Sequence, residues 1–273
     1  MDQPEFATGI RSAATLPPSI RVRTVLVAIL LGLLCFGVIM GATIGVIILN
    51  TRVSPDFAWF PLPATLLIVT ALWFAENRWH IGLTSTTHLP LGRVYALGVG
   101  VTLIGIAACA VQGYFSGYVR ATELLEANVD RTFQRTYAIY MAVFAAVLAE
   151  AIFRGVMQVR MQTVLGRWPV VIIIGIVNVF AHRWGPEITQ NGIGLFVVLA
   201  GWTYLRWISG SLWPPMMMHA GSNLIIAGWL WSRGPIVHAE QPLAGALAVM
   251  AVGVFIASAA RPWSLGGKGV EPI

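Results

Sequence analysis

Long apolar stretches alternate along the chain with short polar or charged connections. No charged side chain occurs between Thr24 and Thr51, and a membrane-spanning helix needs only about 20 apolar residues. The pattern predicts eight helices, at residues 24–50, 57–75, 94–117, 136–158, 168–183, 192–208, 212–231 and 243–260. The fifth and sixth are short for a hydrocarbon layer of about 30 Å, so we expect them to be kinked or to cross only partly.

Composition supports this interpretation. Of 273 residues, 57% are hydrophobic and 10% are charged, whereas a soluble domain carries about 25% charged residues. We therefore expect an all-α fold, a polytopic membrane helical bundle in one transmembrane domain at residues 21–261. Segments 1–20 and 262–273 are rich in Pro, Gly and polar residues and are expected to be flexible tails. The first apolar stretch is longer than a secretory signal core, which predicts a retained helix.

The charges indicate membrane topology. The net charge is +6, but the basic residues are nearly all arginines placed singly around apolar runs, so nucleic acid is not an expected partner. If both termini lie in the cytoplasm, more basic residues fall on the cytoplasmic side than on the outer side. The positive-inside bias therefore predicts cytoplasmic termini. The Arg-rich, Lys-poor composition favours a bacterial inner membrane. The mixed connection at 122–135 predicts an amphipathic helix at the interface.

Only a few polar residues fall inside the predicted helices. Ionisable groups in a bilayer are costly and usually face a bundle interior or a watery cavity. Glu150 and Arg154 lie four residues apart, in the favourable order for an ion pair on one helical face. His219 and Asn223 also share a face, while His182 stands alone near the end of its helix.

Taken singly, each of these polar groups has a structural interpretation. Ion pairs, core histidines and helix-linking amides occur in many proteins without any catalytic role. Three polar clusters on three helices of an apolar chain are better explained by one shared aqueous site. The sequence therefore predicts that they converge.

The clusters, in this order, resemble the three motifs of the CAAX prenyl endopeptidase and bacteriocin-processing family of intramembrane proteases, also called the Abi family. Its motifs are Glu-Glu-x-x-x-Arg, Phe-x-x-x-His and His-x-x-x-Asn or Asp. Here they read Ala-Glu-Ala-Ile-Phe-Arg at 149–154, Asn-Val-Phe-Ala-His at 178–182 and His-Ala-Gly-Ser-Asn at 219–223. The resemblance covers residues 137–231, the motif core of the domain, and includes myxosortase-like bacterial relatives.

The resemblance implies a role for each matching position. A glutamate at position 149 and His182 would activate water, and His219 with Asn223 would stabilise the oxyanion of the cleaved peptide bond. Glu150 and Arg154 would hold their helix in register. The implied substrate is a membrane-anchored protein or peptide in the lipid bilayer: a CAAX-type tail, a sorting signal or a peptide precursor. No cofactor or metal is expected.

Two positions depart from the motifs. Asn178 replaces a Phe, and it could orient His182 from one turn away. Ala149 replaces the glutamate that would be the general base, and Glu150 points about 100° away around the helix. Three explanations remain open: an engineered glutamate-to-alanine change, which we favour, a native pseudoenzyme, or an active protein that uses Glu150 differently.

Other functions remain open as well. Glu, His and His could form a three-ligand zinc site, although the chain has no His-Glu-x-x-His helix and no Cys-based site, since Cys35 and Cys109 lie in apolar runs. A catalytically dead scaffold would fit a degenerate motif. A transporter would also carry intramembrane charges, but paired broken helices in two repeated halves are not seen.

Overall fold

The protein is helical throughout the part of the chain that the computed structural model describes, residues 16–54, 57–85, 87, 89–116, 131–182, 186–233 and 243–260. The all-α prediction is confirmed, and each predicted apolar stretch corresponds to a helix, although the helix predicted at 57–75 begins only at Pro61. Seven stretches form α2 (Pro18–Val53), α3 (Pro61–Trp79), α4 (Leu91–Ser116), α8 (Arg167–His182), α9 (Pro186–Ser209), α10 (Trp213–Arg233) and α11 (Leu243–Ala260).

The remaining stretch, the fourth, forms one long continuous helix, here called the central helix. It changes its winding four times along its length. Its parts are α5 (Arg131–Tyr140), the π-helical η1 (Met141–Ala145), α6 (Ala146–Glu150), the π-helical η2 (Ala151–Met157) and α7 (Gln158–Gln162).

Some predictions fall largely on residues outside the described part. The structure does not describe residues 1–15 and 261–273, which include most of the two predicted tails. Helix α2 begins at Pro18, within the predicted N-terminal tail. The interfacial helix expected at 122–135 is also outside the described residues, apart from the segment from Arg131 onward that opens α5.

Multi-pass membrane character is supported by helix length and hydropathy. Five helical segments are long and apolar enough to cross a membrane: 18–53, 91–116, 136–162, 188–209 and 243–260. The sixth predicted helix is longer than expected, because α9 begins at Pro186. Helix α8 is apolar, but its 16 residues make it only about 24 Å long. Among the described residues α3 and α10 fall short because polar side chains interrupt them, so eight crossings remain a prediction.

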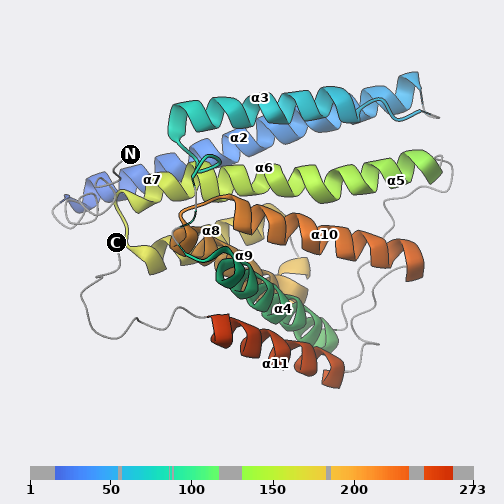
Figure 1. Ribbon diagram of the computed structural model, residues 1–273. Coiled ribbons are helices and arrows are strands. Elements are labelled where there is room, and N and C mark those ends of the chain that lie inside the picture. The colour runs from blue at the N-terminus through green and yellow to red at the C-terminus, as the bar shows by residue number, and fades with distance from the viewer. Residues whose placement is uncertain are drawn as a thin grey trace.

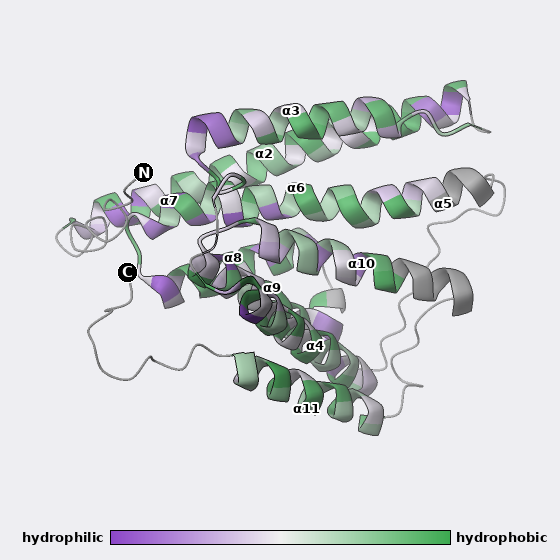
Figure 2. Cartoon of the chain, in the orientation of Figure 1, coloured by the Kyte–Doolittle hydropathy of each residue, from purple (hydrophilic) through white to green (hydrophobic). Residues whose placement is uncertain are grey.

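The helices form layers around the central helix (Figure 1). Helices α2 and α3 run side by side along one flank of it, and α10 packs against α6 and η1. Helix α9 lies between α8 and α4, and α11 covers the outer side of α4. Hydrophobic residues predominate along α4 and α11, whereas hydrophilic residues gather at the end of α3 that leads into the next loop (Figure 2).

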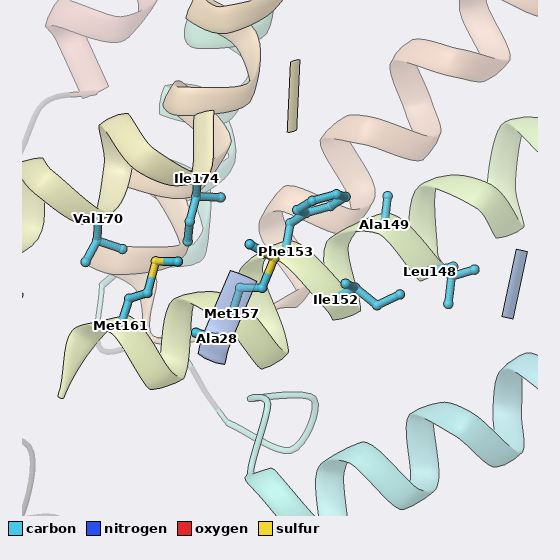
Figure 3. Close-up of a cluster of buried hydrophobic side chains, with 9 residues drawn as sticks. All are labelled: Ala28, Leu148, Ala149, Ile152, Phe153, Met157, Met161, Val170 and Ile174. Atoms are coloured by element: carbon cyan, nitrogen blue, oxygen red, sulfur yellow. The ribbon is translucent and has the colours of Figure 1, made fainter. Parts of the chain in front are cut away.

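Apolar packing fixes α8 against the central helix. Val170 and Ile174 of α8 belong to a buried cluster with Phe153, Met157 and Met161. Figure 3 shows these side chains facing one another, with Ala149 one turn before Phe153. The cluster lies directly beside the polar groups described below.

Helices α4, α9 and α11 approach closely at glycines. A Cβ on Gly194 of α9 would overlap the backbone of Ala108 and Cys109 in α4. A Cβ on Gly100 of α4 would lie 2.6 Å from the backbone nitrogen of Ala257 in α11. Small residues permit such contacts between membrane helices, and dispersion between the backbones then stabilises them.

Hydrogen bonds hold the loop between α3 and α4 against the start of α10. The Glu76 carboxylate accepts hydrogen bonds from the backbone N–H groups of Gly82 and Leu83, at 3.0 and 3.1 Å. The Leu212 N–H donates to the Gly82 carbonyl at 3.1 Å, and the Trp213 indole donates to the Leu83 carbonyl at 2.8 Å. The loop between α3 and α4 thus sets where α10, and with it His219, enters the bundle.

Replacing Gly194 by valine should push α4 and α9 apart. Overpacking of a close contact typically costs about 1–3 kcal/mol, so we expect a lower melting temperature in detergent. Gly45→Val is the matched control, because a Cβ on Gly45 meets no neighbouring atom. Equal melting temperatures for the two variants would contradict the close approach.

Candidate active site

A fully buried ion pair lies at the centre of the site. Arg154 Nη1 is 2.8 Å from Oε1 of Glu150, and neither side chain is exposed. The pair predicted from the four-residue spacing is therefore present. Because isolated charges are strongly disfavoured in a low-dielectric interior, each charge compensates the other there.

Helix α9 supplies further partners for Arg154. Nη2 donates to the Leu199 carbonyl at 2.7 Å, and Nε donates to the Thr203 hydroxyl at 3.2 Å. Gln158, one turn after Arg154, donates to the Thr203 carbonyl at 3.2 Å. The guanidinium also lies over the Trp202 ring, 5.9 Å from its centroid. Polar contacts thus tie the central helix to α9.

Glu150 also reaches α10. Its Oε1 lies 2.8 Å from Nδ1 of His219, which is 6% exposed. The expectation that Glu150 points away from the site holds only in part: its carboxylate does not line the cavity, but it contacts a histidine that does. This contact was not foreseen from the sequence.

A cavity of about 590 Å³ opens beside these groups. Alanine methyl groups from α5, η1 and α6 line much of one wall, and apolar side chains from α2, α4 and α9 line the rest. The polar and motif residues that face it include Ala149, His182, Trp202, His219, Ser222 and Asn223. Its size is within the range of pockets that enclose small ligands or peptide segments.

The two histidines meet although they come from different levels of their helices. His182 ends α8 and His219 lies in the second turn of α10, yet their ring centroids are 6.1 Å apart. The Trp202 ring packs on His219 at 4.6 Å between centroids and restricts its rotation.

Asn223 links α10 to the π-helical segment η1. Its Nδ2 donates to the Ala142 carbonyl at 3.2 Å. π-Helical segments are frequent at functional sites because they reshape the local helix face. Here η1 and η2 flank the short α6, which carries Ala149 and Glu150.

The structure thus brings Ala149, His182, His219 and Asn223 to one cavity, with Glu150 and Arg154 behind it. Trp202 and Thr203 were not predicted. Nothing in the sequence distinguishes Trp202 from the other tryptophans. Thr203 and Gln158 are polar residues inside apolar stretches, and that signal could have identified them.

Among the described residues, no group of three His, Cys, Asp or Glu side chains is placed to hold a metal ion. Glu150 contacts His219 and Arg154, and His182 Nδ1 lies 2.9 Å from the main-chain oxygen of Asn178. The absence of a cofactor remains a prediction.

Residues 132–225 match the family model of the type II CAAX prenyl endopeptidase Rce1-like proteins. The family resemblance is confirmed. The match to the Rce1-like family contains all four motif residues that line the cavity, and it implies a hydrolase of peptide bonds that acts on membrane-associated protein. No curated protein and no solved structure matches the chain.

Removing Arg154 tests the buried pair. Arg154→Met leaves the Glu150 carboxylate without its guanidinium, which should destabilise the protein by about 3–5 kcal/mol. The double variant Glu150→Gln/Arg154→Met should recover part of the loss. Thermal unfolding in detergent measures both, with the exposed Arg52→Met as control. If Arg154→Met and Arg52→Met unfold alike, the pair does not stabilise the bundle.

Proposed function

We propose that the protein is an intramembrane endopeptidase that hydrolyses a peptide bond near the terminus of a membrane-anchored substrate. The observation that carries the proposal is the convergence of Ala149, His182, His219 and Asn223 on one cavity within an apolar bundle. The match to the Rce1-like family over residues 132–225 supports the same reaction class.

The cavity groups suit hydrolysis when a carboxylate stands at position 149. That carboxylate and His182 would take a proton from water as it attacks the peptide carbonyl. His219 and Asn223 would donate to the developing oxyanion, and one such donor is worth about 3 kcal/mol in a water-poor pocket. The C–N bond then breaks as the proton passes to the leaving amine, so that the products are a carboxylic acid and an amine.

The chain as it stands has only a methyl group at this position. Glu150 does not replace the missing carboxylate directly, because its side chain is fully buried against Arg154 and His219. We therefore propose that this chain is inactivated by the alanine at position 149, so that it binds its substrate but cleaves it poorly or not at all.

Restoring the carboxylate should restore cleavage. Ala149→Glu is expected to raise the rate by about 10²–10⁴-fold, the usual contribution of a positioned general base. Ala149→Gln is the matched control, since it fills the same space without a base. Cleavage is followed on substrates in detergent or liposomes. An Ala149→Glu protein that folds normally but gains no activity on any substrate class would contradict the proposal.

The substrate class remains to be determined between a prenylated CAAX tail and a C-terminal sorting signal or peptide precursor. We favour the latter, because the Arg-rich, Lys-poor composition suggests a GC-rich bacterial genome and protein prenylation is chiefly eukaryotic. The same proposal places the protein in a bacterial inner membrane with cytoplasmic termini. Labelled substrates of each kind, tested on the Ala149→Glu protein, distinguish the two classes.

We propose a reaction without a metal, because the chain has no His-Glu-x-x-His helix. Elemental analysis of the pure protein should give no stoichiometric zinc, and a chelator should leave Ala149→Glu cleavage unchanged. Zinc at one equivalent, lost together with activity on chelation, would show that the reaction depends on it.

A substrate-binding scaffold is the second candidate function. Ala149 favours it, because a chain without the general base could still bind a partner. A scaffold would bind one partner tightly and would stay inactive after Ala149→Glu.

A further inference from the structure

Two arginines lie together at one end of the bundle, away from the cavity. Arg78 is in the last turn of α3, and Arg160 is in α7 at the end of the central helix (Figure 1). Arg160 packs on Trp79, the neighbour of Arg78, with its guanidinium carbon 4.7 Å from the ring centroid. We infer that these three residues, here called the basic cluster, bind the phosphate of an anionic phospholipid at the membrane interface.

The positive charge of the basic cluster has no counter-ion in the described part of the chain. Neither Arg78 nor Arg160 forms an ion pair there, and neither guanidinium donates a hydrogen bond to another described residue. The charge of Arg78 also repels that of Arg160. The carboxylate of Glu76, one helical turn away, accepts instead from backbone N–H groups of the following loop. An anion that contacts both arginines would relieve the repulsion and accept several of their N–H donors.

Trp79 holds the Arg160 side chain in place. The indole is partly buried against the apolar cluster that contains Ile81 and Val156. The Phe74 ring packs against it nearly at right angles, with centroids 5.7 Å apart. The attraction between the guanidinium and the indole face limits the motion of Arg160, so less conformational entropy is lost when that side chain binds an anion.

The surroundings favour a lipid over a free phosphate. The ends of α3 and of the central helix both lie on the cytoplasmic side in the predicted topology, and basic sites between membrane helices on that side typically bind anionic headgroups. Phe74 precedes Trp79 by five residues, which places it about 7 Å deeper along α3. Its side chain is 54% exposed. An apolar surface therefore continues from the arginines toward the hydrocarbon layer, where the acyl chains of a lipid would pack.

General anchoring is the competing interpretation. Arginine and tryptophan also hold membrane helices at the interface without preference for one lipid. On that interpretation every exposed arginine of the cytoplasmic side contributes alike. Arg93 provides the comparison, because it is exposed on the same predicted side, at the start of α4, and stacks on no aromatic ring among the described residues.

Lipid titration of the full chain in detergent, followed by native mass spectrometry, tests the site. We expect phosphatidylglycerol to bind at least about fivefold more tightly than phosphatidylcholine. Arg78→Gln and Arg160→Gln should each weaken phosphatidylglycerol binding about fivefold, the usual contribution of one basic residue near an anionic surface. Both should leave phosphatidylcholine binding unchanged. Arg93→Gln is the matched control and should change neither affinity.

Trp79→Leu tests whether the indole positions Arg160. The leucine keeps an apolar side chain but removes the aromatic face, so phosphatidylglycerol binding should weaken about two- to fivefold. Trp168→Leu is the matched control, because Trp168 also lies under an arginine, with the guanidinium carbon of Arg167 4.9 Å from its ring centroid. It should leave the affinity unchanged. Equal losses in the two variants contradict the role of Trp79.

Two results overturn the inference. Equal affinity for the two lipids, or a loss in Arg93→Gln equal to that in Arg78→Gln and Arg160→Gln, would indicate general anchoring. Glycerol phosphate that displaces phosphatidylglycerol at an equal concentration would identify a soluble phosphate ester as the ligand. If Arg160→Gln does not fold, the exposed Arg78→Gln decides the comparison. The outcome is independent of peptide hydrolysis, because no residue of the basic cluster lines the cavity.

Discussion

One buried ion pair organises the polar part of this bundle. Arg154 and Glu150 sit in the central helix without exposure, where isolated charges would be strongly disfavoured. The other donors of Arg154 are met by Asn178 of α8 and by Leu199 and Thr203 of α9, and Oε1 of Glu150 contacts His219 of α10, whereas the buried Oε2 of Glu150 has no hydrogen-bond partner among the described residues. Four segments distant in sequence are therefore fixed by a requirement to satisfy two charges, and apolar packing fills the space around them.

The cavity owes its shape to small side chains and altered helix winding. Alanines at 138, 142, 145, 146 and 149 leave one wall close to bare backbone. The π-helical segment η1 turns the Ala142 carbonyl toward Asn223, which ties α10 to this wall. On the far side, glycines let α4, α9 and α11 pack tightly, and side chains of α4 and α9 line the cavity there.

Much of this could be predicted from the sequence, because its strongest signals are local. The apolar stretches gave the helices, and four-residue spacing placed Glu150 with Arg154 and His219 with Asn223 on shared faces. The contact of Glu150 with His219 joins residues 69 positions apart, and helix periodicity carries no information on it. The contact between His182 at the end of α8 and His219 in the second turn of α10 is likewise not encoded in the position of either residue along its own helix. Glu76 and His219 are among the polar residues that lower the hydropathy of α3 and α10, and their contacts become visible only in the folded chain.

The partners of Arg154 have a consequence for biosynthesis. The central helix leaves the ribosome before any of the helices that satisfy its guanidinium, and Thr203 follows Arg154 by 49 residues. At about 5–20 residues per second, α9 emerges several seconds later. Throughout that interval the guanidinium lacks most of its final acceptors, which raises the free-energy cost of placing the central helix among lipids. The helices made later lower that cost when they pack against the central helix, so the folding of the second half of the chain is coupled to the stability of the central helix in the membrane.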